Sequence, residues 1–376
     1  MKIAFVNCWT MPWGVMQVLN DLLIKALRKN WPEAQIQLFT LISEQKQLHI
    51  PIPWSPEKSY TIPIIQALPN WLAKLFLYFK KRKVKILSSI FDYRNLIVFY
   101  PLFMKILSRK IKKRKPDEVQ ISSFAIAKNI DPIGVPTSLY LHSPMQYIRS
   151  HYEEYLGKFH WWKKWLFKKI APKLRKRDQS YTKFDTIVSN SHYTQKLAKQ
   201  IYVFSSTVHY PTISDQYRYM GISQTPKPYF VCVGRLVSFV RECEIIIKLF
   251  NELKLPLLMI GSGPDEEKLK NIAGETIIFT GRMQDGLAET IKDSSGLINL
   301  TKESFGIGTA EALLMGVPVL GFEEGASAEL IDQDSGILVA DKSLPTLKKA
   351  MHEFMSRARD RKKISENIRH KLQNNK

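Results

Sequence analysis

The sequence predicts an α/β protein made of two domains, and three observations lead to that prediction. Its 376 residues, 45% of them apolar, exceed the usual size of a single hydrophobic core. Short apolar segments alternate with amphipathic helical segments along most of the chain, as in parallel α/β folds. The alternation lapses once, in a stretch around residues 210–228 that carries proline, serine and glycine. We therefore expect an N-terminal domain over residues 1–217, a linker over 218–227 and a C-terminal domain over 228–376.

The first half opens with an apolar strand at residues 2–7, a loop at 8–14 and a helix from Val15 to Lys29 with apolar residues at helical spacing. Residues 34–41 alternate in the manner of a strand. Further strands are expected at 118–122, 136–142, 186–191 and 206–211, with helices between them. This order favours a parallel sheet covered by helices.

The second half repeats the alternation with shorter and more apolar strands, as fully buried parallel strands read. The expected strands lie in YFVCVG, PLLMIGSG, TIIFTG and GLINLT. Helices are expected through 242–253, 264–273, 286–294 and the segment that contains Glu311, followed by a basic helical tail at 346–373. Ligands of such sheets bind at the carboxyl ends of the strands, so the loops that follow these strands are the candidate site.

Charge is distributed unevenly along the chain. Residues 1–220 contain 35 lysine and arginine residues against 13 acidic ones, whereas residues 221–376 contain 21 of each, so the whole excess of +22 lies in the first part. We expect this part to face an anionic partner, either nucleic acid or an anionic membrane surface. Cys8, Cys232 and Cys243 form no disulfide framework and no metal-ligand spacing, which favours a reducing compartment. No stretch approaches the roughly 20 apolar residues of a membrane span, and the first apolar run is too short for a signal peptide.

Three strand-end loops of the second half carry residues suited to a phosphorylated ligand. Arg235 and Arg241, in VGRLVSFVR, can hold a diphosphate bidentately, although a surface arginine would read the same way. Gly263, in IGSGP, lets a ligand approach the backbone, but a plain tight turn fits equally well. Met283, in FTGRM, ends another strand at the same edge. The spacing is not GxGxxG, so a dinucleotide fold is not supported.

The fourth loop is ESFGIGTAEALLMGVPVL, which places Glu303 before a glycine turn and Glu311 inside the helix that follows. Phe305, Gly306 and Ile307 lie at the start of this helix, where unpaired N–H groups and the helix dipole form an anion site. Glu303 can face a sugar ring, and Glu311 can accept hydrogen bonds from a ribose diol. In the alternative interpretation, Glu303 is a capping carboxylate and Glu311 is a solvated helix residue.

These motifs, together with GVPVLGF and EGASAELI, resemble in order and spacing the donor domain of GT-B glycosyltransferases of family 4. The resemblance implies two Rossmann-like domains whose parallel sheets face across a cleft. It also implies a retaining, metal-independent transferase that uses a nucleotide-diphosphate sugar and no cofactor. In that family the arginine of the GRL motif and a following lysine hold the diphosphate; here Val240 stands where the lysine is commonest, and Arg241 is the expected replacement. DQD at 332–334 is interpreted as a turn of this family and not as a metal site.

The first half extends the resemblance. His142, in TSLYLHSPMQYI, resembles the strand-end histidine that the family places against the transferred sugar, although a lone histidine is more often structural. Its context is closest to bacterial enzymes that use GDP-mannose in cell-surface polysaccharide synthesis, but Gln146 and residues 149–150 depart from their pattern. Gly14 corresponds to the family's glycine turn near the donor, with Trp13 in place of the first glycine of the usual pair.

Basic clusters with aromatic residues occur at 79–85, 108–115 and 158–177. On a helical wheel over residues 159–171, one half of the circle carries Phe159, Trp161, Trp162, Trp165, Leu166 and Ile170. Most lysines fall on the other half, and Phe167 strays from the apolar group. Two interpretations stay open: the tryptophan face packs into the core, or it lies at an anionic membrane surface.

We therefore expect a hexosyltransferase that moves mannose from GDP-mannose to a lipid-linked or polysaccharide acceptor. It would work in the cytoplasm, peripherally at the inner face of the cell membrane. His142 and Glu303 would be catalytic, and Arg235, Arg241 and the helix start would bind the diphosphate. A basic nucleic-acid-binding protein is an alternative, disfavoured because no recognisable nucleic-acid module is present. A non-catalytic glycan-binding protein of the same fold is another, disfavoured by the intact Glu303, Glu311 and His142.

Overall fold

The computed structural model describes residues 1–7, 13–30, 32–41, 43, 45–68, 99–124, 126–150, 152–181, 183–221, 227–283 and 285–375. The chain divides into two compact units, unit 1 (Met1–Asn190 and Thr194–Val208) and unit 2 (Ser191–Tyr193 and His209–Lys376). The division falls at residues 208–209, ahead of the boundary that the sequence analysis places at Tyr217. Residues 209–217 thus group with the second unit.

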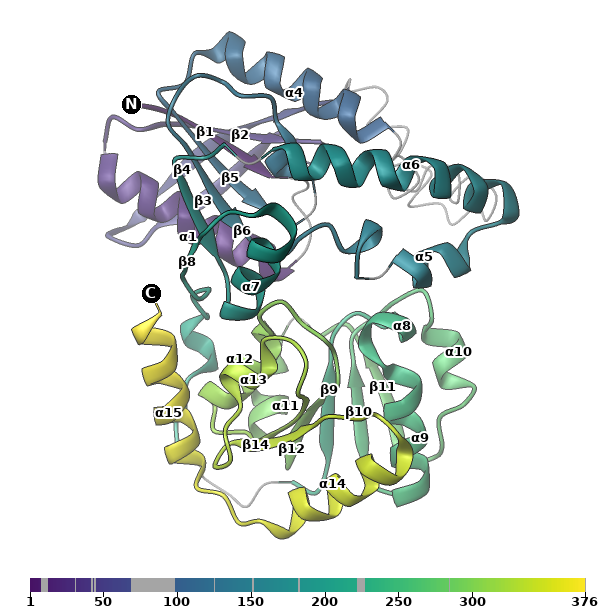
Figure 1. The fold of residues 1–376 in the computed structure, drawn as a ribbon. Helices are drawn as coiled ribbons and strands as arrows, with labels where there is room; N and C mark the ends of the chain where they lie inside the picture. The colour runs from purple at the N-terminus through teal and green to yellow at the C-terminus, as the bar shows by residue number, and fades with distance from the viewer. Residues whose placement is uncertain are drawn as a thin grey trace. The chain divides into compact units, whose positions relative to one another are not determined.

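Unit 1 contains, in its described part, an eight-stranded sheet with the order β3-β4-β2-β1-β5-β6-β7-β8 (Figure 1). The strands are β1 (Lys2–Asn7), β2 (Gln35–Thr40), β3 (Gln47–Ile52), β4 (Ser55–Gln66), β5 (Glu118–Ser123), β6 (Thr137–Leu141), β7 (Thr186–Ser189) and β8 (Thr207–Val208). Neighbouring strands pair in parallel, except that β3 and β4 form an antiparallel hairpin.

The β3–β4 hairpin was not among the predicted elements. Its strands contain Pro51 and Pro63, and proline within an apolar run argues against a central strand because it cannot donate to the ladder. The hairpin lies at the edge of the sheet, and β3 is the outermost strand. Pro51 lies on this edge strand, where half of the backbone groups need no partner strand. Pro63 lies on β4, directly before residues 64–66, which pair with β2.

The helices of unit 1 are α1 (Trp13–Asn30), α4 (Tyr100–Arg114), α5 (Tyr152–Lys158), α6 (Trp161–Ser180) and α7 (His192–Tyr202), with 3₁₀ turns η2 (Ala127–Asn129) and η3 (Gln146–Ile148). Leu19, Leu23 and Ala26 of α1 are buried, as their helical spacing predicts. Because α1 begins at Trp13, Gly14 lies in its first turn and not in the preceding loop, where the sequence analysis put it. The basic cluster at 108–115 forms the C-terminal half of α4 and its cap, and the cluster at 79–85 lies outside the described residues.

Helix α6 packs a different face from the one that the helical wheel suggested. Its buried side chains recur at about one helical turn, and they are Phe167, Ala171, Leu174 and Asp178. Trp161, Trp162 and Trp165 are instead 75%, 48% and 58% exposed. The interpretation that the tryptophans pack into the core is therefore wrong. Phe167, which strayed from the predicted apolar face, is buried in the core, and Phe159 and Ile170 of that face are partly buried against it.

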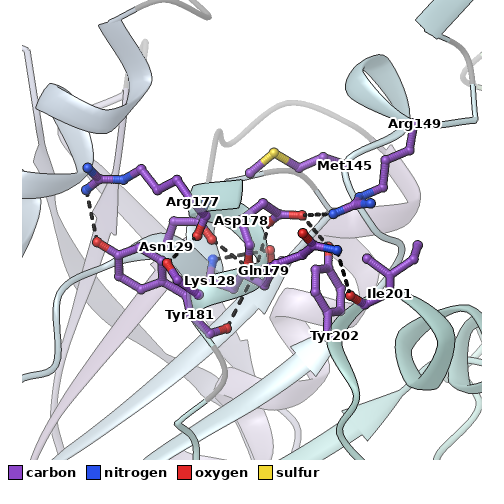
Figure 2. A network of polar contacts seen from close by, with 12 residues as sticks. Lys128, Asn129, Met145, Arg149, Arg177, Asp178, Gln179, Tyr181, Ile201 and Tyr202 are labelled. Atoms are coloured by element: carbon purple, nitrogen blue, oxygen red, sulfur yellow. Dashed lines mark hydrogen bonds and ion pairs between the residues drawn. The ribbon is translucent and has the colours of Figure 1, made fainter. Parts of the chain in front are cut away.

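Asp178 fixes the C-terminal half of α6 to the rest of unit 1 (Figure 2). Its Oδ1 lies 2.9 Å from Nζ of Lys128 on η2, and the two side chains are 0% and 1% exposed. Its Oδ2 accepts a hydrogen bond from the Tyr202 hydroxyl at 2.8 Å and lies 3.3 Å from the guanidinium of Arg149. The Lys128 ammonium also donates to Oδ1 of Asn129 at 3.1 Å. Without Asp178 the buried charge of Lys128 would be uncompensated, so the pair constrains both segments.

Unit 2 contains a six-stranded sheet in the order β11-β10-β9-β12-β13-β14, with every neighbouring pair parallel. The strands are β9 (Phe230–Val233), β10 (Leu257–Ile260), β11 (Ile277–Gly281), β12 (Gly296–Asn299), β13 (Val319–Phe322) and β14 (Gly336–Val339). The first four coincide with the predicted strands, and the predicted α/β class with parallel sheets is confirmed in both units.

The helices of unit 2 are α8 (Ser238–Arg241), α9 (Cys243–Leu253), α10 (Glu266–Lys270), α11 (Leu287–Asp293), α12 (Ile307–Leu314), α13 (Ser327–Leu330), α14 (Leu344–Ser356) and α15 (Arg361–Asn374), with the 3₁₀ turn η4 (Asp215–Tyr217). The predicted basic tail is two helices, because Asp360 caps a new one by accepting from the backbone N–H groups of Lys362 and Lys363. Helix α15, yellow in Figure 1, packs against α12, and its Ser365 hydroxyl donates to the Leu314 carbonyl at 2.6 Å.

Candidate functional site

The strand order of unit 2 reverses between β9 and β12. The chain runs outward from β9 to β10 and β11 on one side, and from β12 to β13 and β14 on the other. In open α/β sheets ligands bind beyond the carboxyl ends of the strands at such a point, where the two following loops diverge. The loops at residues 234–237 and 300–306 therefore form the candidate site.

Arg241, Glu303 and Asn299 meet at this point. The guanidinium of Arg241, at the end of α8, lies 2.5 Å from Oε1 of Glu303. The other carboxylate oxygen of Glu303 accepts a hydrogen bond at 2.8 Å from Nδ2 of Asn299, the last residue of β12. The same amide nitrogen donates to the Thr309 hydroxyl on α12 at 3.0 Å. The side chains of Arg241 and Glu303 are 29% and 15% exposed, so the pair is fixed and still reached by solvent.

Two glycines leave room for this ion pair. A Cβ at Gly234, directly after β9, would lie 3.1 Å from Nε of Arg241, and one at Gly306 would lie 3.1 Å from Oε2 of Glu303. Gly306 has φ 91°, a left-handed conformation that strains other residues, and it precedes the first turn of α12. The sequence thus places a residue without a side chain beside each charged group of the pair.

The start of α12 lies next to Glu303. Gly306 caps the helix and Ile307 begins it, so their N–H groups lie at the positive end of the helix dipole. The side chain of Phe305 is buried and its ring packs on Tyr210, with ring centres 5.2 Å apart, so only its backbone is suited to an anion.

Glu311 is 8% exposed, which excludes the interpretation of this residue as a solvated helix position. It lies near Tyr217 of η4: burial and, next in importance, the charges of Glu311 and Glu289 raise the pKa of the Tyr217 phenol to about 12. An enclosed carboxylate beside the start of an anion-attracting helix is suited to a hydroxylated ligand, because each hydroxyl can donate to it.

The loops after β9 and β10 pack closely against each other, and glycines make this close packing possible. A Cβ at Gly261 would lie 1.9 Å from the Gly234 carbonyl oxygen, and one at Gly263 would lie 2.0 Å from that of Leu236. Close packing between the two loops therefore explains these glycines without a ligand. Arg235 is exposed beside them, and Met283, after β11, is half-buried.

In unit 1, His142 follows β6 and is 7% exposed. Its Nε2 is 2.8 Å from the Ser122 hydroxyl, and its ring packs edge-on against Tyr140 and Phe124. Burial lowers the pKa of His142 to about 3, so the ring is neutral at physiological pH. It can therefore act through hydrogen bonds, and not as a cation; with Nε2 committed to Ser122, a ligand contact falls to Nδ1.

Other predicted features have a plain structural account. Asp332, the first residue of DQD, accepts backbone hydrogen bonds from Asp334 and Ser335 and pairs with Lys371 at 2.9 Å, which confirms the predicted turn. The described residues contain no group of three or more His, Cys, Asp or Glu side chains that could hold a metal ion. Cys232 and Cys243 are buried free thiols.

The sequence analysis did not select Asn299 or Thr309. Asn299 ends an apolar strand four residues before Glu303, and a polar residue at the end of such a strand could have been selected as a candidate site residue. Ser191 ends the strand expected at 186–191, and its hydroxyl donates to the carbonyl of Ser304 at 2.5 Å, so it supports the same loop.

Two units with parallel sheets, and a charged site at the switch point of the second, define the chain as a protein of the GT-B fold. Residues 227–357, which lie in unit 2, match the family model described as Glycosyl transferases group 1. A curated relative, N-acetyl-alpha-D-glucosaminyl L-malate synthase of Bacillus anthracis, is 33% identical over 159 residues, which are 37% of this chain and 42% of the relative. The chain thus spans less than half of that relative's length.

Solved structures cover nearly the whole chain. The sucrose-phosphate synthase of Thermosynechococcus elongatus has a TM-score of 0.66 at 14% identity and covers 100% of this chain and 94% of its own. Anabaena Alr3699/HepE, in complex with UDP and glucose, has a TM-score of 0.58 at 14% identity and covers 99% of each chain. These likenesses establish the fold. No helix within the described ranges has the length and apolar character needed to cross a membrane.

Proposed function

We propose that this chain is a retaining glycosyltransferase that moves a hexose from a nucleotide-diphosphate sugar to a hydroxyl of a lipid-linked or polysaccharide acceptor at the inner face of the cell membrane. The observation that carries the proposal is the Arg241–Glu303–Asn299 cluster beside the free start of α12, within residues that match a glycosyltransferase family model. Such a cluster offers a cation and backbone donors to a diphosphate, and carboxylates to the hydroxyls of a sugar.

In the transfer, the bond between the anomeric carbon and the diphosphate oxygen breaks, and its electron pair stays on the diphosphate. The acceptor oxygen bonds to the same face of that carbon, and its proton passes to the leaving diphosphate or to water. Charge develops on the diphosphate, so Arg241 and the N–H groups at the α12 start would stabilise the transition state. Exposed Arg235 would close over the diphosphate. Glu303 and His142 would orient the sugar, and His142 would do so as a neutral ring.

We propose GDP-mannose as the donor because the sequence around His142 resembles mannosyltransferases. A UDP-hexose is the second candidate, because a solved structure of the same fold holds UDP and glucose. Release of nucleotide from a panel of GDP- and UDP-sugars, with and without a membrane-lipid extract as acceptor source, distinguishes the two donors.

Glu303→Gln tests the catalytic assignment. Its matched control is Glu324→Gln, since Glu324 is a 59% exposed carboxylate paired with Lys302 in the same unit. We expect Glu303→Gln to lower kcat by about a hundredfold, because a sugar held out of its reactive orientation loses about that much rate. The control should stay within about twofold. Comparable rates for both variants would contradict the site, and nucleotide binding without turnover of any donor would indicate a non-catalytic protein of this fold.

A further inference from the structure

Three tryptophans on the surface of unit 1 have no part in the proposed transfer. Trp161, Trp162 and Trp165, in the first turns of α6, are 75%, 48% and 58% exposed. Scattered exposed apolar residues are ordinary, but three large aromatic side chains within five positions of one helix form a contiguous exposed patch.

The helix geometry makes this patch one face. At 3.6 residues per turn, Trp161, Trp162 and Trp165 fall within an arc of about 100°, opposite the buried residues Phe167 and Ala171. The surface of α6 is therefore divided between one side that packs into unit 1 and an opposite side that presents indole rings.

Exposed lysines continue the tryptophan face along the helix. Lys169, Lys173 and Lys176 follow Trp165 at helical spacing and are exposed, and Lys164 and Lys168 flank them. The ammonium of Lys169 lies 4.0 Å from the centre of the Trp165 ring. The single acidic residue in the sequence of α6 is Asp178, which is buried against Lys128 and does not offset this charge at the surface.

The C-terminal half of α6 holds this face in place. Phe167, Ala171 and Leu174 pack into the core of unit 1, and the Asp178 network in Figure 2 joins the end of the helix to η2, η3 and α7. The tryptophan end thus belongs to a rigid element and not to a loop that could fold its rings inward.

We propose that the first three turns of α6 dock on an anionic lipid bilayer, with Trp161, Trp162 and Trp165 at headgroup depth and the exposed lysines against the anionic headgroups. Indole rings favour the bilayer interface, and each lysine near an anionic leaflet adds attraction. The alternative anionic partner, nucleic acid, is bound by aromatic rings within a basic groove. Here the rings cover the outward side of a helix, which suits a flat surface. This role rests on the membrane location given in the proposed function and assigns it to a surface; no group of the donor site takes part, so vesicle binding and donor turnover can fail separately.

The test is cosedimentation of the full chain with vesicles of phosphatidylcholine alone or with about 30% phosphatidylglycerol. Trp161→Ser/Trp162→Ser/Trp165→Ser is compared with Trp54→Ser/Val203→Ser/Met220→Ser, which removes three other exposed apolar side chains that are 38%, 87% and 73% exposed. We expect binding to the anionic vesicles only. The α6 variant should lose at least about tenfold in partition coefficient, equivalent to about 1.4 kcal/mol, and the control should keep wild-type binding. Both variants should keep the wild-type Tm and donor binding.

Two charge-reversal variants complete the design of the experiment. Lys169→Glu/Lys173→Glu and Lys248→Glu/Lys349→Glu change the net charge equally, and all four lysines are exposed. Only the α6 pair should weaken vesicle binding, and added salt should weaken it in the wild type.

Four results would overturn the proposal. They are equal binding to neutral vesicles, unchanged binding in the tryptophan variant, tighter binding to a single-stranded oligonucleotide than to the anionic vesicles, and a wild-type dimer that the tryptophan variant abolishes. The last two would assign the face to nucleic acid or to a second copy of the chain.

Discussion

Replacing Asp178 with asparagine keeps the shape of the side chain and removes the charge that balances Lys128. The two side chains are 0% and 1% exposed, so bulk water screens neither of them. Removing one partner of such a buried pair costs about 3–5 kcal/mol. That is a large part of the stability of a typical domain, which is about 5–15 kcal/mol. We expect Asp178→Asn to lower the free energy of unfolding of unit 1 by this amount.

The assay is thermal and urea unfolding of the full chain, followed by circular dichroism. For a unit of this size each kcal/mol corresponds to about 2–4 °C, so Tm should fall by about 6–20 °C. The matched control is Asp185→Asn, which changes an exposed carboxylate that accepts the backbone N–H of Thr137. Asparagine can still accept that bond, so the control should stay within about 1 kcal/mol of the wild type.

The pH dependence of Asp178→Asn tests the cause. Burial lowers the pKa of Lys128, and Asp178 opposes that effect. Without Asp178 the folded-state pKa falls further below the unfolded value, and between the two values the unfolded chain binds more protons. Stability then rises with pH in that window, so the variant should regain stability as pH is raised above neutral.

A double variant, Lys128→Met/Asp178→Asn, removes both charges and should cost less than the sum of the single changes. A loss below about 1 kcal/mol for Asp178→Asn, or strict additivity in the double variant, would refute the reasoning.

Three further predictions concern the proposed site. Arg235→Ala should weaken GDP or UDP binding by about 1.5–3 kcal/mol, the worth of a charged hydrogen bond; unchanged calorimetric affinity for whichever nucleotide binds would remove Arg235 from the site. Glu311→Gln should raise the donor KM more than it lowers kcat, because it weakens ground-state contacts to ribose hydroxyls; a fall in kcat at constant KM would instead place Glu311 at the reacting centre. Because burial lowers the pKa of His142 to about 3, below its unfolded value of about 6.5, the unfolded chain alone takes up the proton between these values, and stability falls as pH is lowered through that window. Urea unfolding at pH 5 and 7 should show a smaller pH effect in His142→Gln than in the wild type, and parallel profiles would contradict a buried neutral ring.

Most of the fold could be predicted from the sequence. Parallel strands that are buried on both faces appear in the sequence as short apolar runs, as in β9 to β12. The β3–β4 hairpin could not be predicted, since its prolines argue against strands. Pro51 is tolerated at the sheet edge, and Pro63 just before the residues that pair with β2, and the sequence locates neither position. Helix α6 shows a second limit. Trp165 and Phe167 are both large and aromatic, and only the position of the sheet decides which of them faces the core.

Part of the candidate site could also be predicted from the sequence. Arg241, Glu303 and Glu311 were selected from motifs at strand ends and a helix start. Their pairing was not predicted: that Arg241 and Asn299 both reach Glu303 depends on β9 and β12 lying side by side. The pairing arises from strand order, and no local pattern in the chain encodes it.

The adjacency of β9 and β12 also has a consequence for how the protein is made. Strands β9, β10 and β11 pair with near neighbours in sequence, as do β12, β13 and β14, whereas the contact of Val231 with Leu297 closes a much longer loop. Long-range pairings carry the larger closure entropy and slow folding. Strands β9, β10 and β11 all precede Glu303 in the chain, so Arg241 is synthesised long before the carboxylate that pairs with it. The site therefore forms only when the two halves of the sheet join at β9 and β12, which makes it one of the last features of unit 2 to be completed.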